Sequence, residues 1–270
     1  MKKKLSSIAG VTLIEILIGI IISTIMMGAM YTSYSVVNNT YSQVTDRAKI
    51  SSAGRDVVGM ILRDIRMAGW KHFGDTIGGS DLLAPILITK AANLATGCDK
   101  IEISYGDVDY LSTRTPKYLY KRYKMIYECQ DSASDPGNAF QVVKSRLLWS
   151  TTSNDWIADT TTDGDSSTYK NEIVLDFVSD FVFNAIDDTG ALIDPPPTAT
   201  NSTKDKLYKI KTVDIGLTVR STKPFFRSSR VRSILGLADT SRDRQFTGED
   251  SKYLRDTIIV TAHARNLGLQ

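Results

Sequence analysis

An apolar run near the N-terminus constrains this chain more than any other feature of its 270 residues. Residues 11–30 carry one charge, Glu15, and a helix over this run is about 30 Å long, the thickness of a bilayer's hydrocarbon core. Lys2, Lys3 and Lys4 precede the run, and no lysine or arginine occurs within it. By the positive-inside rule this asymmetry places the N-terminus in the cytoplasm and the rest of the chain across the membrane.

Two other interpretations of this N-terminus stay open, a cleaved secretory signal and a plain uncleaved anchor. A secretory signal has a shorter apolar stretch and small residues around its cleavage site, whereas this run ends in Met30 and Tyr31. No cysteine lies near the run, which excludes a lipoprotein anchor. The run is best interpreted as a membrane-spanning helix that stays attached to the chain.

The same helix is predicted to continue beyond the membrane. No proline occurs before Pro85, and small or apolar residues recur at steps of three or four, which lays a stripe along one helix face. We therefore predict one helix over residues 12–68, with residues 11–30 as its transmembrane part and residues 31–69 as an amphipathic continuation that packs on a soluble domain. The stripe consists of Val44, Ala48, Ser51, Gly54, Val58, Ile61 or Leu62, Ile65 and Ala68.

Two glycines mark special places on this helix. Gly54 lies in its interior, where glycine costs up to about 1 kcal/mol relative to alanine, so it indicates a bend or a close contact. Gly69 follows the last residue of the stripe and is typical of a helix C-terminus.

Residues 70–270 have the pattern of a β-rich globular domain. Alternation with period two is clearest at residues 213–219 and 118–127, which predicts antiparallel strands that are half-buried. The expected fold class is therefore α+β: a long N-terminal helix, with a transmembrane half and an amphipathic half, packed on an antiparallel β-rich domain. Strands are predicted at residues 101–105, 118–127, 140–149, 173–183, 210–219 and 257–262.

The charge and the motifs argue against a nucleic-acid binder and against an enzyme. The formal net charge is +3, and the lysines of the N-terminal leader account for it, so the body lacks the clustered positive charge that nucleic-acid binding requires. His72 and His263 belong to no metal-binding or nucleophile motif, and no phosphate-binding glycine loop occurs. We expect no nucleic-acid partner, no catalytic residue, no cofactor and no metal.

One loop has some features of a calcium site. Asp159, Asp163 and Asp165 alternate around Gly164, as ligands do at the start of a calcium loop. The twelfth position, where a bidentate glutamate is expected, is Lys170. A solvated loop is the favoured interpretation, and calcium binding is the alternative if the three carboxylates converge in the fold.

Cys98 and Cys129 are the only two cysteines, and both follow the membrane segment. In an oxidising compartment such a pair usually forms a disulfide. The chain-entropy model gives roughly 3–4 kcal/mol for closing a loop of about thirty residues. Two separate buried thiols are the alternative.

The leader and the start of the helix resemble the class III signal of type IV pilins and pseudopilins. The matching features are a short basic leader, Gly10, and Val-Thr-Leu-Ile-Glu opening the apolar helix. The resemblance implies that a prepilin peptidase cuts between Gly10 and Val11, so that residues 1–10 are a cleaved leader, and that Glu15 acts in assembly. The family usually has Phe or Met where this chain has Val11.

Later segments resemble the PilW-type minor pilins. These are the helix end at residues 62–70, with its Arg-x-Ala-Gly-aromatic pattern, and residues 211–221 and 255–266. The resemblance implies a minor pilin of a type IV pilus that helps initiate assembly and lies at or near the fibre tip. A J-type pseudopilin of a type II secretion system is the near alternative. A membrane-tethered periplasmic binding protein or enzyme is the alternative from another class.

The same resemblance implies the partners and the location. The partners are the prepilin peptidase, the other minor pilins, the major pilin, the inner membrane and, at the tip, an adhesin. Before assembly the globular domain would lie in the periplasm with its helix in the inner membrane. After assembly the protein would belong to the pilus fibre at the cell surface.

The position of Glu15 in the membrane segment is consistent with the role in assembly that the resemblance implies. A carboxylate in lipid costs a few kcal/mol at the bilayer centre and less near its edge. Cleavage creates an α-amine at Val11, and the amine of a neighbouring subunit can neutralise Glu15 and set the axial stagger of the helices. An isolated carboxylate that snorkels to the membrane surface is the alternative.

We predict that the mature protein begins at Val11. Gly10→Leu should block processing, because the cleavage site must accept an extended residue without a side chain. Intact-mass analysis of membrane-extracted protein measures this, with peptidase-negative cells as the uncleaved reference. A mature mass that still includes residues 1–10 in peptidase-positive cells would contradict the prediction.

Overall fold

The structure is a computed structural model that describes most of the chain. It divides into two compact units, Met1–Asp46 and Arg47–Gln270. The described residues are 10–70, 84–91, 98–110, 112–113, 115–158, 168–198, 204–234, 237 and 244–267.

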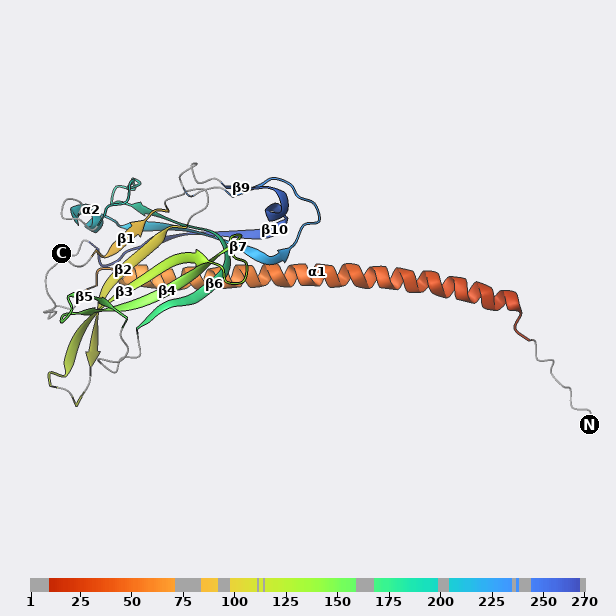
Figure 1. The fold of residues 1–270 in the computed structure, drawn as a ribbon, viewed down its shortest axis with the longest axis horizontal. Coiled ribbons are helices and arrows are strands. Elements are labelled where there is room, and N and C mark those ends of the chain that lie inside the picture. Colours follow the sequence, from red (N-terminus) through yellow and green to blue (C-terminus); the bar gives the residue numbers. More distant parts are fainter. Residues whose placement is uncertain are drawn as a thin grey trace, which may run out of the picture. The chain divides into compact units, whose positions relative to one another are not determined.

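Helix α1, Leu13–Met67, is a single α-helix of 55 residues and confirms the helix predicted from the sequence (Figure 1). It ends at Met67, and Gly69 follows with a φ of +72°, in the left-handed region that terminates helices. By length and composition it is the one helix in the described part of the chain that could cross a membrane. The apolar window that meets this criterion is not buried inside the protein.

An antiparallel sheet forms the body of the second unit, so the α+β fold class is correct. Its strand order is β1-β2-β3-β4-β6-β7-β10, with β5 paired to β4, while β8 and β9 form a separate hairpin sheet. The strands are β1 Ile86–Thr89, β2 Lys100–Tyr110, β3 Tyr118–Asp131, β4 Phe140–Ser150, β5 Asp155–Ile157, β6 Tyr169–Ile186, β7 Thr212–Pro224, β8 Arg232–Ile234, β9 Arg244–Phe246 and β10 Tyr253–His263, and the short helices are α2 Lys204–Tyr208 and η3 Gly248–Lys252.

The six predicted strands correspond to β2, β3, β4, β6, β7 and β10. The structure extends several of them, and β6 reaches 18 residues. The strands that the sequence did not reveal, β1, β5, β8 and β9, have three or four residues each. Segments this short show too little alternation to be recognised.

The core lies between the C-terminal part of α1 and one face of the sheet (Figure 1). Ile61 and Ile65 of the helix are completely buried there. Alternate residues of β7 face them, because side chains on a strand point to opposite faces in turn; these are Val213, Ile215, Leu217 and Val219. Each such side chain contributes about 1.5–3 kcal/mol through burial, which holds this part of the helix on the sheet.

The predicted stripe was wrong at its N-terminal end. Val44 is 64% exposed and Ala48 is exposed as well, while burial on α1 begins at Ile50. Of the bend and the close contact that the sequence allowed at Gly54, the structure shows the close contact. A Cβ atom built on it would lie 2.7 Å from Cδ1 of Ile258 and 3.3 Å from Cγ2 of Val219.

The prediction that residues 213–219 form a half-buried strand was also wrong, because β7 is buried on both faces. On the face away from α1, Thr218 and Arg220 are almost fully buried. The side chain of Leu237 covers Gly216, where a Cβ atom would lie 2.7 Å from Leu237 Cδ1. A segment that follows β7 in the chain thus covers a face that alternation alone marks as exposed.

We predict opposite effects of the same substitution at two glycines of α1. Gly54→Leu should lower the free energy of unfolding by about 1–3 kcal/mol, because the new side chain overpacks the contact with Ile258. Gly59→Leu should raise it by up to about 1 kcal/mol, because Gly59 is exposed and leucine is the better helix former. Denaturant unfolding of the detergent-solubilised full chain measures both, and equal effects at the two sites would contradict the packing.

Candidate functional site

The first turn of α1 holds Glu15 in a capping box with Thr12. Glu15 Oε2 accepts hydrogen bonds from the Thr12 amide at 3.0 Å and from Thr12 Oγ1 at 3.1 Å. The Glu15 amide donates in return to Thr12 Oγ1 at 3.4 Å. The Glu15 carboxylate thus satisfies the Thr12 amide, a donor without a partner within the helix, while the Glu15 amide also donates to the Thr12 carbonyl at 3.1 Å. Our sequence reasoning missed this arrangement, although Thr-x-x-Glu before an apolar run is its known signal.

The residues on either side of the predicted cleavage point precede the helix. Gly10 is exposed, and a Cβ atom built on it would have no neighbour within 4 Å. Val11 is 71% exposed. The peptide bond between them therefore lies in accessible, non-helical chain, and its cleavage stays a prediction.

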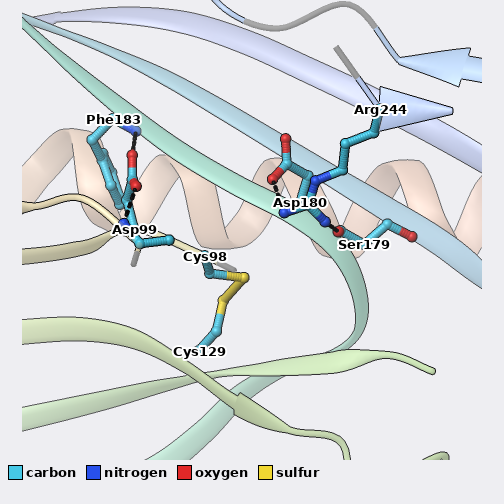
Figure 2. Close-up of a disulfide and its surroundings, with 8 residues drawn as sticks. Cys98, Asp99, Cys129, Ser179, Asp180, Phe183 and Arg244 are labelled. Carbon is cyan, nitrogen blue, oxygen red and sulfur yellow. Dashed lines mark hydrogen bonds and ion pairs between the residues drawn. A yellow bond between two sulfur atoms is a disulfide. The ribbon is translucent and has the colours of Figure 1, made fainter. Parts of the chain in front are cut away.

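Cys98 and Cys129 form a disulfide, as predicted, with 5.8 Å between their Cα atoms (Figure 2). It ties the segment before β2 to the end of β3. The adjacent Asp99 is fully buried, and its carboxylate accepts hydrogen bonds from the amides of Phe183 and Ala91, both at 3.0 Å. The disulfide and this carboxylate together fix the start of β2 against the neighbouring strands.

Asp64 is a buried carboxylate on the sheet-facing side of α1 that our sequence reasoning missed. The hydroxyl of Tyr127 donates to Asp64 Oδ2 at 2.6 Å, and Lys144 Nζ lies 3.0 Å from the same oxygen. Burial, and then the Asp64 charge, raise the pKa of Tyr127, so the phenol keeps its proton and remains a donor. The available signal was the position of Asp64, three residues after Ile61 and thus on the apolar stripe.

A second group of buried charges lies on the opposite side of the sheet. Arg244 is buried and pairs with Asp180 at 3.1 Å, and it donates to the Ser179 carbonyl at 2.6 Å (Figure 2). The fully buried Arg220 pairs with Asp135, and its guanidinium stacks 4.1 Å from the ring centroid of Tyr253. Each arginine has a carboxylate partner, so we interpret the group as structural.

The remaining candidates of the sequence do not form a site among the described residues. Asp159, Asp163 and Asp165 lie outside the described residues, and so does His72. His263 lies in β10, with its Nδ1 3.1 Å from Thr212 Oγ1. Within the part of the chain that the structure describes, no group of three or more His, Cys, Asp or Glu residues could hold a metal ion.

Comparisons with known proteins add little to these observations. No protein-family model matches the chain, and no curated protein matches it. Among solved structures, it is similar to a type IV-like pilin from Thermus thermophilus, with a TM-score of 0.45 and 11% identity over 80% of this chain and 96% of that chain. A similarity of this degree does not assign the chain to a family, so its function must be inferred from its own residues.

We predict that Asp64→Asn lowers the free energy of unfolding by about 2–4 kcal/mol, because it leaves the partly buried Lys144 without its counter-charge. Tyr127→Phe should cost less, about 1–3 kcal/mol, since the ion pair survives. Asp56→Asn is the matched control: Asp56 is exposed on the same helix, and its change should stay within about 0.5 kcal/mol. Equal losses for Asp64→Asn and the control would contradict the role of Asp64.

Proposed function

We propose that this chain is a minor pilin of a type IV pilus. The supporting observation is the difference between the two parts of α1. Its large apolar side chains from Leu13 to Val44 are exposed, whereas most apolar side chains from Ile50 to Ala68 lie in the core of the sheet domain or pack against it. A long exposed apolar helix surface needs lipid or other apolar helices around it. A pilin meets both surroundings in turn, first in the inner membrane and then in the fibre.

In this proposal the chain is processed before it assembles. The prepilin peptidase removes residues 1–10, residues 11–30 span the inner membrane, residues 31–69 continue the helix, and residues 70–270 fold in the periplasm. The disulfide between Cys98 and Cys129 fits an oxidising compartment of this kind. The subunit then joins other minor pilins and the major pilin to initiate the fibre. It lies at or near the tip, where an adhesin can be carried.

In this proposal Glu15 exchanges one set of hydrogen-bond donors for another when the subunit moves from the membrane into the fibre. In the single subunit, the Thr12 amide and hydroxyl donate to the carboxylate, which reduces the cost of placing it in lipid. In the fibre, the α-amine of Val11 from a neighbouring subunit supplies a stronger, charge-assisted bond. Because that amine exists only after cleavage, processing and assembly are coupled through one ion pair.

We predict that Glu15→Leu and Glu15→Gln both reduce co-purification with the other minor pilins and surface piliation. Leucine removes the carboxylate, whereas glutamine keeps an oxygen that can accept the Thr12 hydrogen bonds and removes only the charge. Membrane insertion should be normal in both, since each substitution makes the segment less costly to insert. Protein level and cleavage are measured in parallel by immunoblot and intact mass.

Thr12→Val is the matched control, because it removes the capping hydroxyl and keeps the Glu15 charge. Assembly should survive this change. Normal assembly with glutamine at residue 15 would mean that Glu15 acts only as a helix cap, and the proposed ion pair would be abandoned. Co-purification with type IV pilus components rather than type II secretion components identifies the machinery.

A further inference from the structure

A cavity of about 540 Å³ lies between α1 and the sheet within the second unit. Asp64 and Met67 of the helix line one side, and Tyr105 of β2, Lys144 of β4 and Tyr169 of β6 line the other. This volume falls within the range of about 300–1,000 Å³ that is typical of small-molecule sites. The cavity contains none of the residues that carry the proposed pilin function, so it requires an explanation of its own.

A guanidinium group, that of Arg146, lines the cavity. Arg146 of β4 lines the cavity with its guanidinium 4.0 Å from the ring centroid of Tyr123. Its Nε atom is buried, and no described residue accepts a hydrogen bond from it. A ligand in the cavity does not reach this buried nitrogen, but the guanidinium carries further N–H donors, and a charged donor of this kind forms stronger hydrogen bonds to an anion than a neutral one does.

Two tyrosines add neutral donors to the same space. Burial is the main cause that raises the pKa of Tyr105 and of Tyr169, each to about 12, so both hydroxyls are protonated at neutral pH. The charges of Asp64 and Arg146 act on both phenols, which indicates that the four groups are close together. A ligand in the cavity would therefore meet several hydrogen-bond donors at once.

Positive charge predominates around this space. Its lining includes four cations, Arg63, Arg66, Lys144 and Arg146, and two carboxylates, Asp64 and Asp107. Lys144 is paired with Asp64 at 3.0 Å, whereas Arg63 and Arg66 are exposed on the helix, one turn apart. A partly enclosed site with an excess of cations concentrates anions from solution.

Two tyrosine rings beside the cavity, those of Tyr123 and Tyr127, each have a cation over one face. The guanidinium of Arg146 stacks on Tyr123, and Lys144 Nζ lies 5.1 Å from the ring centroid of Tyr127. Stacking of an aromatic ligand on either ring would have to displace a cation. These two ring faces are therefore not available to a ligand, and the cations over them add positive charge near the cavity.

We propose that this cavity binds a small anionic ligand of about sugar size, whose carboxylate or phosphate group contacts Arg146 and the Arg63–Arg66 pair. Tyr105 and Tyr169 donate to further oxygens of the ligand. This ligand binding is additional to the pilin function proposed above and does not depend on it.

Isothermal titration calorimetry of the detergent-solubilised full chain tests the proposal with three probes: D-glucuronate, D-glucose 6-phosphate and D-glucose. We expect at least one of the two anions to bind and neutral glucose to bind at least tenfold more weakly. Binding of glucuronate alone assigns a carboxylate ligand, and binding of the sugar phosphate alone assigns a phosphate. Failure of both anions, or equal binding of glucose, would overturn the proposal.

Substitutions of the lining arginines test whether the anions bind in this cavity. Arg146→Gln should weaken binding by about tenfold or more, because a charge-assisted contact is lost. The double variant Arg63→Gln/Arg66→Gln should also weaken it, and these exposed residues can change without loss of the fold. Arg227→Gln is the control, since Arg227 is exposed and does not line the cavity.

The variants distinguish specific binding in the cavity from nonspecific attraction of anions to the positive charges of the protein surface. Equal weakening in the control would show that the anions respond only to surface charge, and would overturn the proposal. Unchanged affinity in folded Arg146→Gln would do the same. If Arg146→Gln fails to fold, the double variant alone decides, and unchanged affinity there would overturn the proposal.

Discussion

Helix α1 buries Val57, Ile61 and Ile65 against one face of the antiparallel sheet, and the main features of the globular unit follow from this contact. Its burial energy, at about 1.5–3 kcal/mol for each large side chain, fixes this part of the helix firmly. The contact is close enough at Gly54 that Ile258 fills the place of a side chain. It also creates the cavity, because the helix supplies one wall and β2, β3, β4 and β6 supply the others.

A buried carboxylate inside this apolar contact selects one rotation of the helix. Apolar side chains alone tolerate small rotations and shifts, because burial is not directional. Asp64 needs both Tyr127 and Lys144, and it meets them only when its own face of the helix points at β3 and β4. Any other rotation leaves charges buried without partners, at a cost of several kcal/mol. The ion pair thus adds specificity where the hydrophobic contact supplies most of the stability.

Glu15 and Asp64 are carboxylates on the same helix, and their different surroundings give them different roles. Glu15 is exposed, and among the described residues its carboxylate is bonded only to Thr12, one turn away, so its bonds can be exchanged for those of another subunit. Asp64 is buried and bonded to two strands, so its partners cannot be exchanged without unfolding. In the proposed function, the first contributes to assembly and the second to the stability of the subunit.

The sequence by itself determined the length of α1, its end shortly before Gly69 and the main strands, and it favoured the pairing of Cys98 with Cys129. Helices and strands follow from local periodicity, and two cysteines allow one intramolecular pair. Only the tertiary structure brought Asp64 to Tyr127, which lies 63 residues away, buried both faces of β7, and gathered Arg146 and Tyr169 around one cavity. These features are contacts between distant segments. Local sequence patterns indicate which side chains of a segment are exposed to solvent, but they do not indicate which other segment covers the buried ones.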